Sequence, residues 1–69
     1  MTHEIVSATN QRGVIAIVAR LASGKLYQYL VDSDDNDLAT VEADFRNATR
    51  LADVAEKYQA DVEPLSRQR

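Results

Sequence analysis

The sequence predicts an α+β fold, a small antiparallel β-meander of three to four strands followed by one C-terminal helix packed on one sheet face. Two turns with glycine divide runs rich in Val, Ile, Leu and Tyr, which indicates strands. Alanines recur at helical spacing near the end of the chain, which indicates a helix. With 69 residues there is room for one core. We therefore expect a single domain over residues 1–65 and a flexible tail over 66–69.

The first half of the chain contains three predicted strands. Glycine takes up the positive φ that tight turns demand, and the residues that flank both glycines are good strand formers. The turns are Asn10–Gly13 and Ser23–Gly24, and the strands that they delimit cover residues 4–9, 14–22 and 25–32. This pattern is typical of an antiparallel meander.

Residues 38–45 fit two structures. Their apolar side chains alternate with polar ones, as in a fourth strand. The same residues also have the 3-4 spacing of a long helix that would run to Val62. Such a helix would be about twice the mean helix length and would place Asp44 on the apolar side. We therefore favour the strand, with the long helix as the alternative.

The predicted C-terminal helix covers residues 48–58 and begins after Asn47, a residue type that favours the N-cap. Its apolar side consists of Ala48, Leu51, Ala52, Ala55 and Tyr58. Small alanine side chains allow a helix to lie close to a sheet. Pro64 prevents the helix from continuing, and residues 61–63 are predicted as a short edge strand.

The second turn decides which side chains share a sheet face, because the side-chain period of a strand is two. With Ser23–Gly24 as a two-residue loop, Leu21 lies opposite Leu26, and Arg20 lies across from Tyr27 at cation–π distance. A loop of three or four residues would change this pairing. One face then carries Ile15, Ile17, Ala19, Leu21, Leu26, Gln28 and Leu30. The other carries Val14, Ala16, Val18, Arg20, Tyr27, Tyr29 and Val31.

One helix covers only one face, and the more aliphatic face is the better core. The second face is then left exposed with tyrosines and an arginine, which are enriched at interface hot spots. The predicted partner-binding residues are Val18, Arg20, Tyr27, Tyr29 and Val31. Two alternatives stay open: Tyr and Val are common on strands for their propensity alone, and the chain's own loop 32–37 or C-terminal segment could cover this face.

The sequence offers little for catalysis or metal binding. It has no cysteine, and His3 is its only histidine, so neither a thiolate site nor a histidine-activated serine is expected. Residues 32–37 resemble the start of an EF-hand loop, but Asp37 replaces the required glycine and Ala43 the bidentate glutamate. We expect no enzyme activity, no metal site and no cofactor.

The most consistent function is that of a small acidic, cytoplasmic protein-protein interaction module, a regulator or inhibitor that binds another protein or a second copy of itself as a homodimer. The alternative is a single-stranded nucleic-acid binder that stacks bases on the tyrosines beside Arg20. The net charge of −3 opposes binding to a phosphate backbone. The N-terminus lacks the pattern of a secretory signal, and the longest apolar run, Val14–Ala19, is too short for a membrane span.

Overall fold

Three consecutive antiparallel strands form the first half of the protein in a computed structural model that describes residues 3–65. The strands are β1 (Glu4–Gln11), β2 (Val14–Arg20) and β3 (Leu26–Asp32). The predicted meander is therefore confirmed. The β1–β2 loop consists of Arg12 and Gly13, both with positive φ (55° and 78°), which is the two-residue hairpin geometry that matches strand twist.

Residues 38–45 form a helix, so the prediction of a fourth strand there is wrong. α1 spans Leu38–Asn47, and a second helix, α2, spans Leu51–Tyr58. The Asp37 carboxylate accepts a hydrogen bond from the backbone N–H of Thr40 and caps the first turn of α1. Since strand alternation and helical spacing both place Val41 and Phe45 on one side, the apolar pattern alone did not separate the two structures.

The predicted single long helix is also absent, because the chain is extended at Ala48 and Arg50 between α1 and α2. Asn47 is the last residue of α1 and not the N-cap of the next helix, which begins three residues later than predicted. Asp44, which argued against a helix, accepts hydrogen bonds from the Tyr58 hydroxyl and from Lys57 Nζ (3.1 Å). A polar residue of α1 is thus satisfied by side chains of α2.

The last strand, β4 (Asp61–Leu65), pairs with β3 and completes a sheet of order β1-β2-β3-β4. The predicted edge strand over residues 61–63 is confirmed and extends to Leu65. Gln59 ends α2 in the left-handed conformation and turns the chain toward the sheet. The helices lie between β3 and β4 in the chain, so the fold is α+β with two helices instead of one. The predicted tail over residues 66–69 lies outside the described residues.

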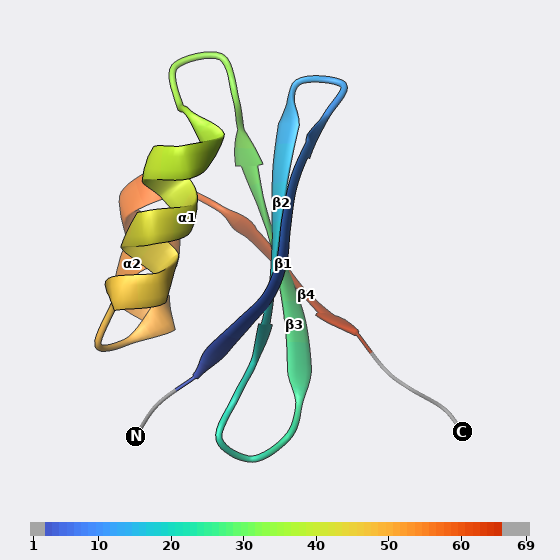
Figure 1. Ribbon diagram of the computed structural model, residues 1–69, viewed down its shortest axis with the longest axis vertical. Helices are drawn as coiled ribbons and strands as arrows, with labels where there is room; N and C mark the ends of the chain where they lie inside the picture. The colour runs from blue at the N-terminus through green and yellow to red at the C-terminus, as the bar shows by residue number, and fades with distance from the viewer. Residues whose placement is uncertain (1–2, 66–69) are drawn as a thin grey trace.

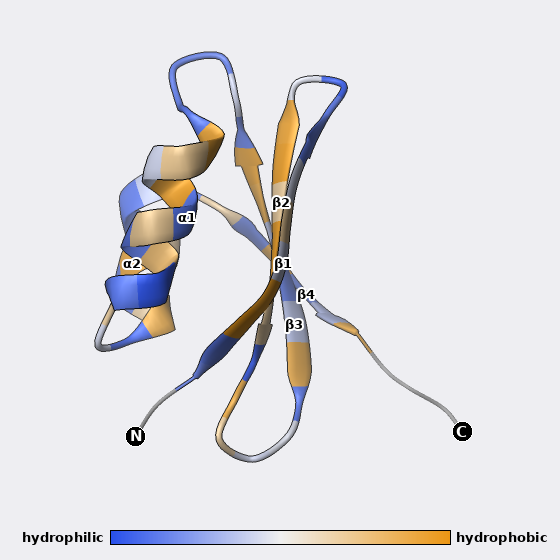
Figure 2. Cartoon of the chain, viewed as in Figure 1, coloured by the Kyte–Doolittle hydropathy of each residue, from blue (hydrophilic) through white to orange (hydrophobic). Residues whose placement is uncertain are grey.

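Both helices lie on the same side of the twisted sheet (Figure 1). The core is the layer between them, and every residue in it is apolar or aromatic. Its members are Ile15, Ile17, Ala19, Tyr29, Val31, Val41, Phe45, Leu51, Val54 and Ala55. The hydropathy colours agree, since the β3–α1 loop is hydrophilic whereas β2 is mostly hydrophobic (Figure 2). The protein is therefore a two-layer structure with a one-sided core.

Candidate functional site: the open face of the sheet

The β2–β3 hairpin sets the composition of both sheet faces, and its predicted register is wrong by one residue. The loop contains three residues, Ala22 to Gly24, and is closed by a 2.8 Å hydrogen bond from the Leu21 N–H to the Lys25 carbonyl oxygen. Val18 is therefore opposite Gln28, where a two-residue loop would have placed Tyr29. A shift of one residue exchanges the two faces of β3 relative to β2.

This shift places the tyrosines of β3 on the side of the helices. Tyr29 is only 6% exposed, and its ring centroid lies 5.2 Å from that of Phe45 in α1. Val31 is 1% exposed, and Tyr27 is half-buried against the core. Burial raises the pKa of the Tyr29 phenol above its usual value, as expected for a hydroxyl inside the molecule. Tyr29 and Val31 are therefore buried under the helices, which contradicts the expectation that they are exposed, whereas Tyr27 stays partly exposed.

Val18 and Arg20 do lie on the opposite side of the sheet, away from the helices, and this side is called the open face below. Arg20 NH1 lies 2.7 Å from Glu4 Oε1 of β1, and the guanidinium is paired there instead of with Tyr27. In residues 3–65 the cation above an aromatic ring is Lys57, 5.3 Å from the centre of the Tyr58 ring. The five residues predicted for one site are thus divided between two faces.

The open face carries six apolar side chains on three neighbouring strands, called here the apolar stripe. None of them belongs to the core or packs against it, and each is at least partly exposed, Val14 to 39%. The register pairs Ala16 with Leu30 and Leu26 with Leu65, and Gln28 lies between the two leucines of β3. The stripe consists of Val14, Ala16, Val18, Leu26, Leu30 and Leu65.

Sequence reasoning missed Leu26 and Leu30, although one signal points to them. Glycine at the third position of Ala22-Ser23-Gly24 fits a three-residue hairpin loop that ends in a left-handed residue. Gly24 has a φ of 94°, as that loop type demands. Choosing this loop would have paired the correct residues and placed both leucines on the open face.

The two borders of the stripe differ in charge. Toward β1 the neighbouring side chains are the neutral Ser7, Thr9 and Gln11, and Glu4, whose carboxylate is paired with Arg20. Toward β4 they are Asp61 and Glu63, which pair in register with Leu30 and Gln28. A third carboxylate, that of Asp32, lies at the end of β3 across from Val14. The carboxylates of Asp61, Glu63 and Asp32 are exposed, and no ion pair within residues 3–65 engages them.

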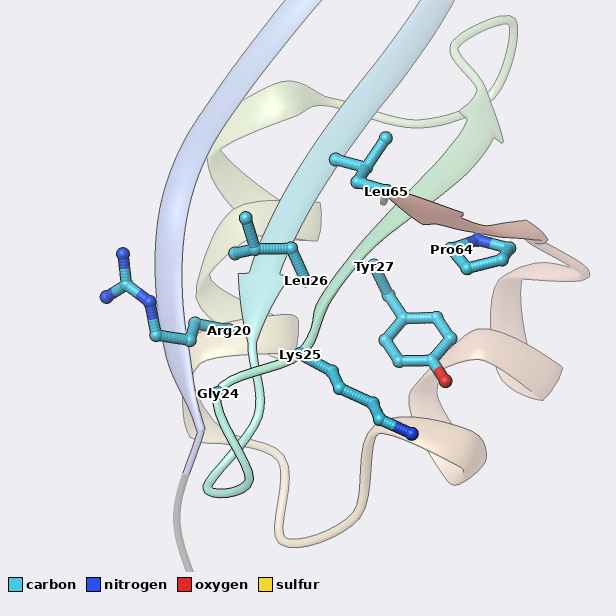
Figure 3. A pocket seen from close by; sticks show the side chains of 7 residues that line it. All are labelled: Arg20, Gly24, Lys25, Leu26, Tyr27, Pro64 and Leu65. Atoms are coloured by element: carbon cyan, nitrogen blue, oxygen red, sulfur yellow. The ribbon is translucent and has the colours of Figure 1, made fainter. Parts of the chain in front are cut away.

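A hollow of about 600 Å³ lies beside the end of the stripe, between the β2–β3 loop and β4. Its lining is mixed and includes Arg20, Gly24, Lys25, Leu26, Tyr27, Pro64 and Leu65. In Figure 3 the head groups of Arg20 and Lys25 point to opposite sides, and the hollow therefore does not gather its two cations around one point. The leucines make it an extension of the stripe, not a separate anion site.

The polar groups of the acidic segment after β3 form hydrogen bonds within that segment. Asp32 Oδ1 accepts a hydrogen bond from the Asp34 N–H at 3.0 Å, and the Asn36 amide donates to the Asp32 carbonyl oxygen at 2.7 Å. Asp37 caps α1. No cluster of three or more His, Asp or Glu side chains suited to a metal ion occurs in the described part of the chain.

The remaining titratable contacts join elements of the helical layer. His3 Nε2 donates to the Phe45 carbonyl oxygen at 2.8 Å and ties the start of β1 to α1. The hydrogen bond to Asp44 raises the pKa of Tyr58 to about 12, and the same bond, with one from Lys57, lowers the pKa of Asp44. These groups lie in the helical layer, away from the open face. Asp44 and Lys57 line an open hollow of about 380 Å³ between α1 and α2, together with residues of the α1–α2 connection.

Comparison of the chain with protein-family models, curated proteins and solved structures finds no match. Within residues 3–65 neither helix has the length and hydropathy needed to cross a membrane. The geometry of the open face is therefore the feature of the molecule that bears on its function.

Proposed function

We propose that this protein is a small non-enzymatic interaction module, of the regulator or inhibitor type, that docks another protein on its open face. The observation that carries the proposal is the one-sided cover: α1 and α2 pack on one face, and the apolar stripe on the other face has no cover among residues 3–65. Single exposed apolar residues are common on surfaces, but six on one face of three neighbouring strands, interrupted in β3 only by Gln28, are typical of an interaction site.

The size of the stripe indicates a weak or transient complex. Adjacent strands lie about 4.8 Å apart and rise about 3.4 Å per residue, so the stripe is roughly 10 Å wide and 20 Å long. Val14 is 39% exposed and the other five stripe residues are less exposed, so completing their burial contributes at most about 1 kcal/mol for each side chain. Together they offset the rotational and translational cost of association only in part, which favours micromolar or weaker affinity.

Nucleic-acid binding, the alternative from the sequence, has less support. Stacking needs exposed aromatic rings, whereas Tyr29 is buried and Tyr27 packs on the core side. The carboxylates beside the stripe, Asp61 and Glu63, would repel phosphates. A protein partner agrees better with both features.

The proposal is tested with a double variant of the stripe, Val18→Gln with Leu30→Gln. Its control is Ala52→Gln with Val62→Gln, which replaces an exposed alanine of α2 and an exposed valine of β4 that pairs with Tyr29 on the side of the helices. Each protein is immobilised and exposed to a lysate of the cells that make it. Retained proteins are quantified by mass spectrometry, and the best candidate is purified for calorimetry.

We expect a partner that binds the parent and the control alike and binds the stripe variant at least tenfold more weakly, since the variant loses roughly 1 kcal/mol at each of two contacts. Equal binding to all three proteins contradicts the proposal. Light scattering over a range of concentrations is run in parallel. A parent dimer that the stripe variant abolishes would identify a second copy as the occupant in place of another protein.

A further inference from the structure

We infer that the segment docking on the open face is an amphipathic helix whose lysines or arginines lie along the flank that meets β4. This inference rests on the proposed function and adds the chemistry of the partner. It follows from the shape of the stripe and from the unequal charge of its two borders.

The shape of the stripe suits one helix. A helix with its side chains is about 10–12 Å across and rises about 1.5 Å per residue, so about 13 residues span a 20 Å stripe. The protein uses the same arrangement on its other face, where Val41 and Phe45 of α1 are fully buried in the layer against the sheet. The mixed aliphatic lining of the open face offers a partner helix an equivalent surface.

The unequal charge of the two borders indicates which flank of the partner helix is basic. Asp61 and Glu63 follow one side of the stripe, and Asp32 lies at one end. The opposite border, on β1, has one carboxylate, that of Glu4, and its charge is paired with the Arg20 guanidinium at the far end. Cations on one flank of an incoming helix would meet the carboxylates of Asp61, Glu63 and Asp32 while its other flank meets hydroxyl and amide groups. Rim charges of this kind set orientation and association rate more than affinity.

A second copy of the chain fits this surface less well. Two open faces brought together would contribute six border carboxylates besides those of Glu4, three from each copy. The cation of each face, Arg20, already has Glu4 as its partner. The net charge of −3 per chain adds a general repulsion between copies. A basic partner avoids both the repulsion among the border carboxylates and the repulsion between two negatively charged chains.

The experiment uses three fluorescent peptides of 14 residues. The first is a helix with leucines on one face, lysines along one flank and glutamines elsewhere. The second has glutamate in place of each lysine. The third has the composition of the first in an order that leaves no apolar face. Binding to the full chain is measured by fluorescence anisotropy at low and at moderate salt.

We expect the lysine peptide to bind at least tenfold more tightly than either of the others. The variant Asp61→Asn with Glu63→Gln should weaken its binding about fivefold, as expected for two exposed charge pairs. The control Asp53→Asn with Glu56→Gln removes two exposed carboxylates from α2 and changes the net charge equally. It should change the affinity less than twofold.

Several results would overturn the inference. Tight binding of the third peptide, which has no apolar face, would mean that general attraction between opposite charges is sufficient for binding. The same conclusion would follow if the β4 and α2 variants weakened the binding of the lysine peptide equally. A third result is that the lysine and glutamate peptides bind equally well and that both lose affinity for the variant Val18→Gln with Leu30→Gln. This result would support the open face as the docking site and contradict a basic partner. Absence of binding by every peptide also overturns the inference, while the capture experiment decides the proposed function separately.

Discussion

At the scale of single residues, Asp44 shows how a polar side chain is tolerated on a packed helix. The Tyr58 hydroxyl and the Lys57 ammonium both donate to its carboxylate, so one group of α1 holds two groups of α2. Phe45 stacks on the Tyr58 ring at 6.3 Å between centroids and adds an aromatic contact at the same place. The sequence argument against a helix at Asp44 failed because these partners are 13 and 14 residues further along the chain.

This contact predicts the behaviour of the protein in base. Ionised Tyr58 would face the Asp44 carboxylate, so its pKa is raised from 10.0 to about 12. The folded state therefore keeps the proton longer than the unfolded state, and the stability from this contact is complete below pH 10 and lost as pH rises toward 12. Absorbance of tyrosinate at about 295 nm should show a late-titrating group that is missing in Tyr58→Phe. In Asp44→Asn it should titrate closer to pH 10; an unchanged titration there would contradict the assignment.

At the scale of elements, loop length determined which side chains became core. Two hairpin loops that look alike in sequence differ in structure: Arg12–Gly13 is a two-residue loop, and Ala22–Gly24 is a three-residue loop. Each contains one glycine at positive φ. Because the strand period is two, one added loop residue exchanges the faces of β3. Tyr29 therefore lies in the core and Leu30 on the open face.

Two substitutions in these loops should have opposite effects. A Cβ at Gly24 meets no atom within 4 Å, so Gly24→Ala costs only the strain of positive φ, about 1 kcal/mol. Arg12 already has a φ of 55°, and Arg12→Asn should stabilise by about 0.5 kcal/mol because asparagine tolerates this conformation better. Urea unfolding of both variants and of the parent measures the differences in the free energy of unfolding. Equal stability of Gly24→Ala and the parent would place the loop conformation in doubt.

The boundary between the two helices, like the loop length, could not be predicted from the local sequence. The second half of the chain has enough apolar residues at helical spacing to form a long helix, yet two helices form with an extended break at Ala48–Arg50. The break lets α2 pack beside α1, where Leu51 and Val54 enter the core. Nothing in the local sequence marks this break strongly, since Arg50, the N-cap residue of α2, makes no side-chain capping hydrogen bond.

At the scale of the whole molecule, every buried residue among residues 3–65 lies in the layer between the helices and the sheet. A chain of this length has a free energy of unfolding of about 3–10 kcal/mol, and the core between helices and sheet must supply it. The same one-sidedness leaves the stripe partly exposed. Under the proposed function, stability and interaction depend on opposite faces of β2 and β3.

Neighbouring residues of β2 should therefore respond very differently to the same change. Ile17 is fully buried, whereas Val18 belongs to the stripe. Ile17→Thr removes apolar contacts and buries a hydroxyl, which should cost about 2–4 kcal/mol and leave much of the protein unfolded. Val18→Thr should cost less than about 1 kcal/mol. Thermal unfolding followed by circular dichroism separates them; a similar loss in both would mean that the open face is covered.

The sequence by itself determined the meander, the edge strand near Pro64 and the presence of apolar residues on both sides of the central strands. These depend on local turn chemistry and on the period of two, which a short window of residues contains. Only the tertiary structure decided the register of the second hairpin, the helical state of residues 38–45 and the identity of the open face. Those features depend on contacts between residues distant in the chain, such as Tyr29 with Phe45 and Asp44 with Tyr58. Because such contacts select a three-residue loop in place of a two-residue loop, the side chains of β3 that were expected in the core lie on the surface, and those expected on the surface lie in the core.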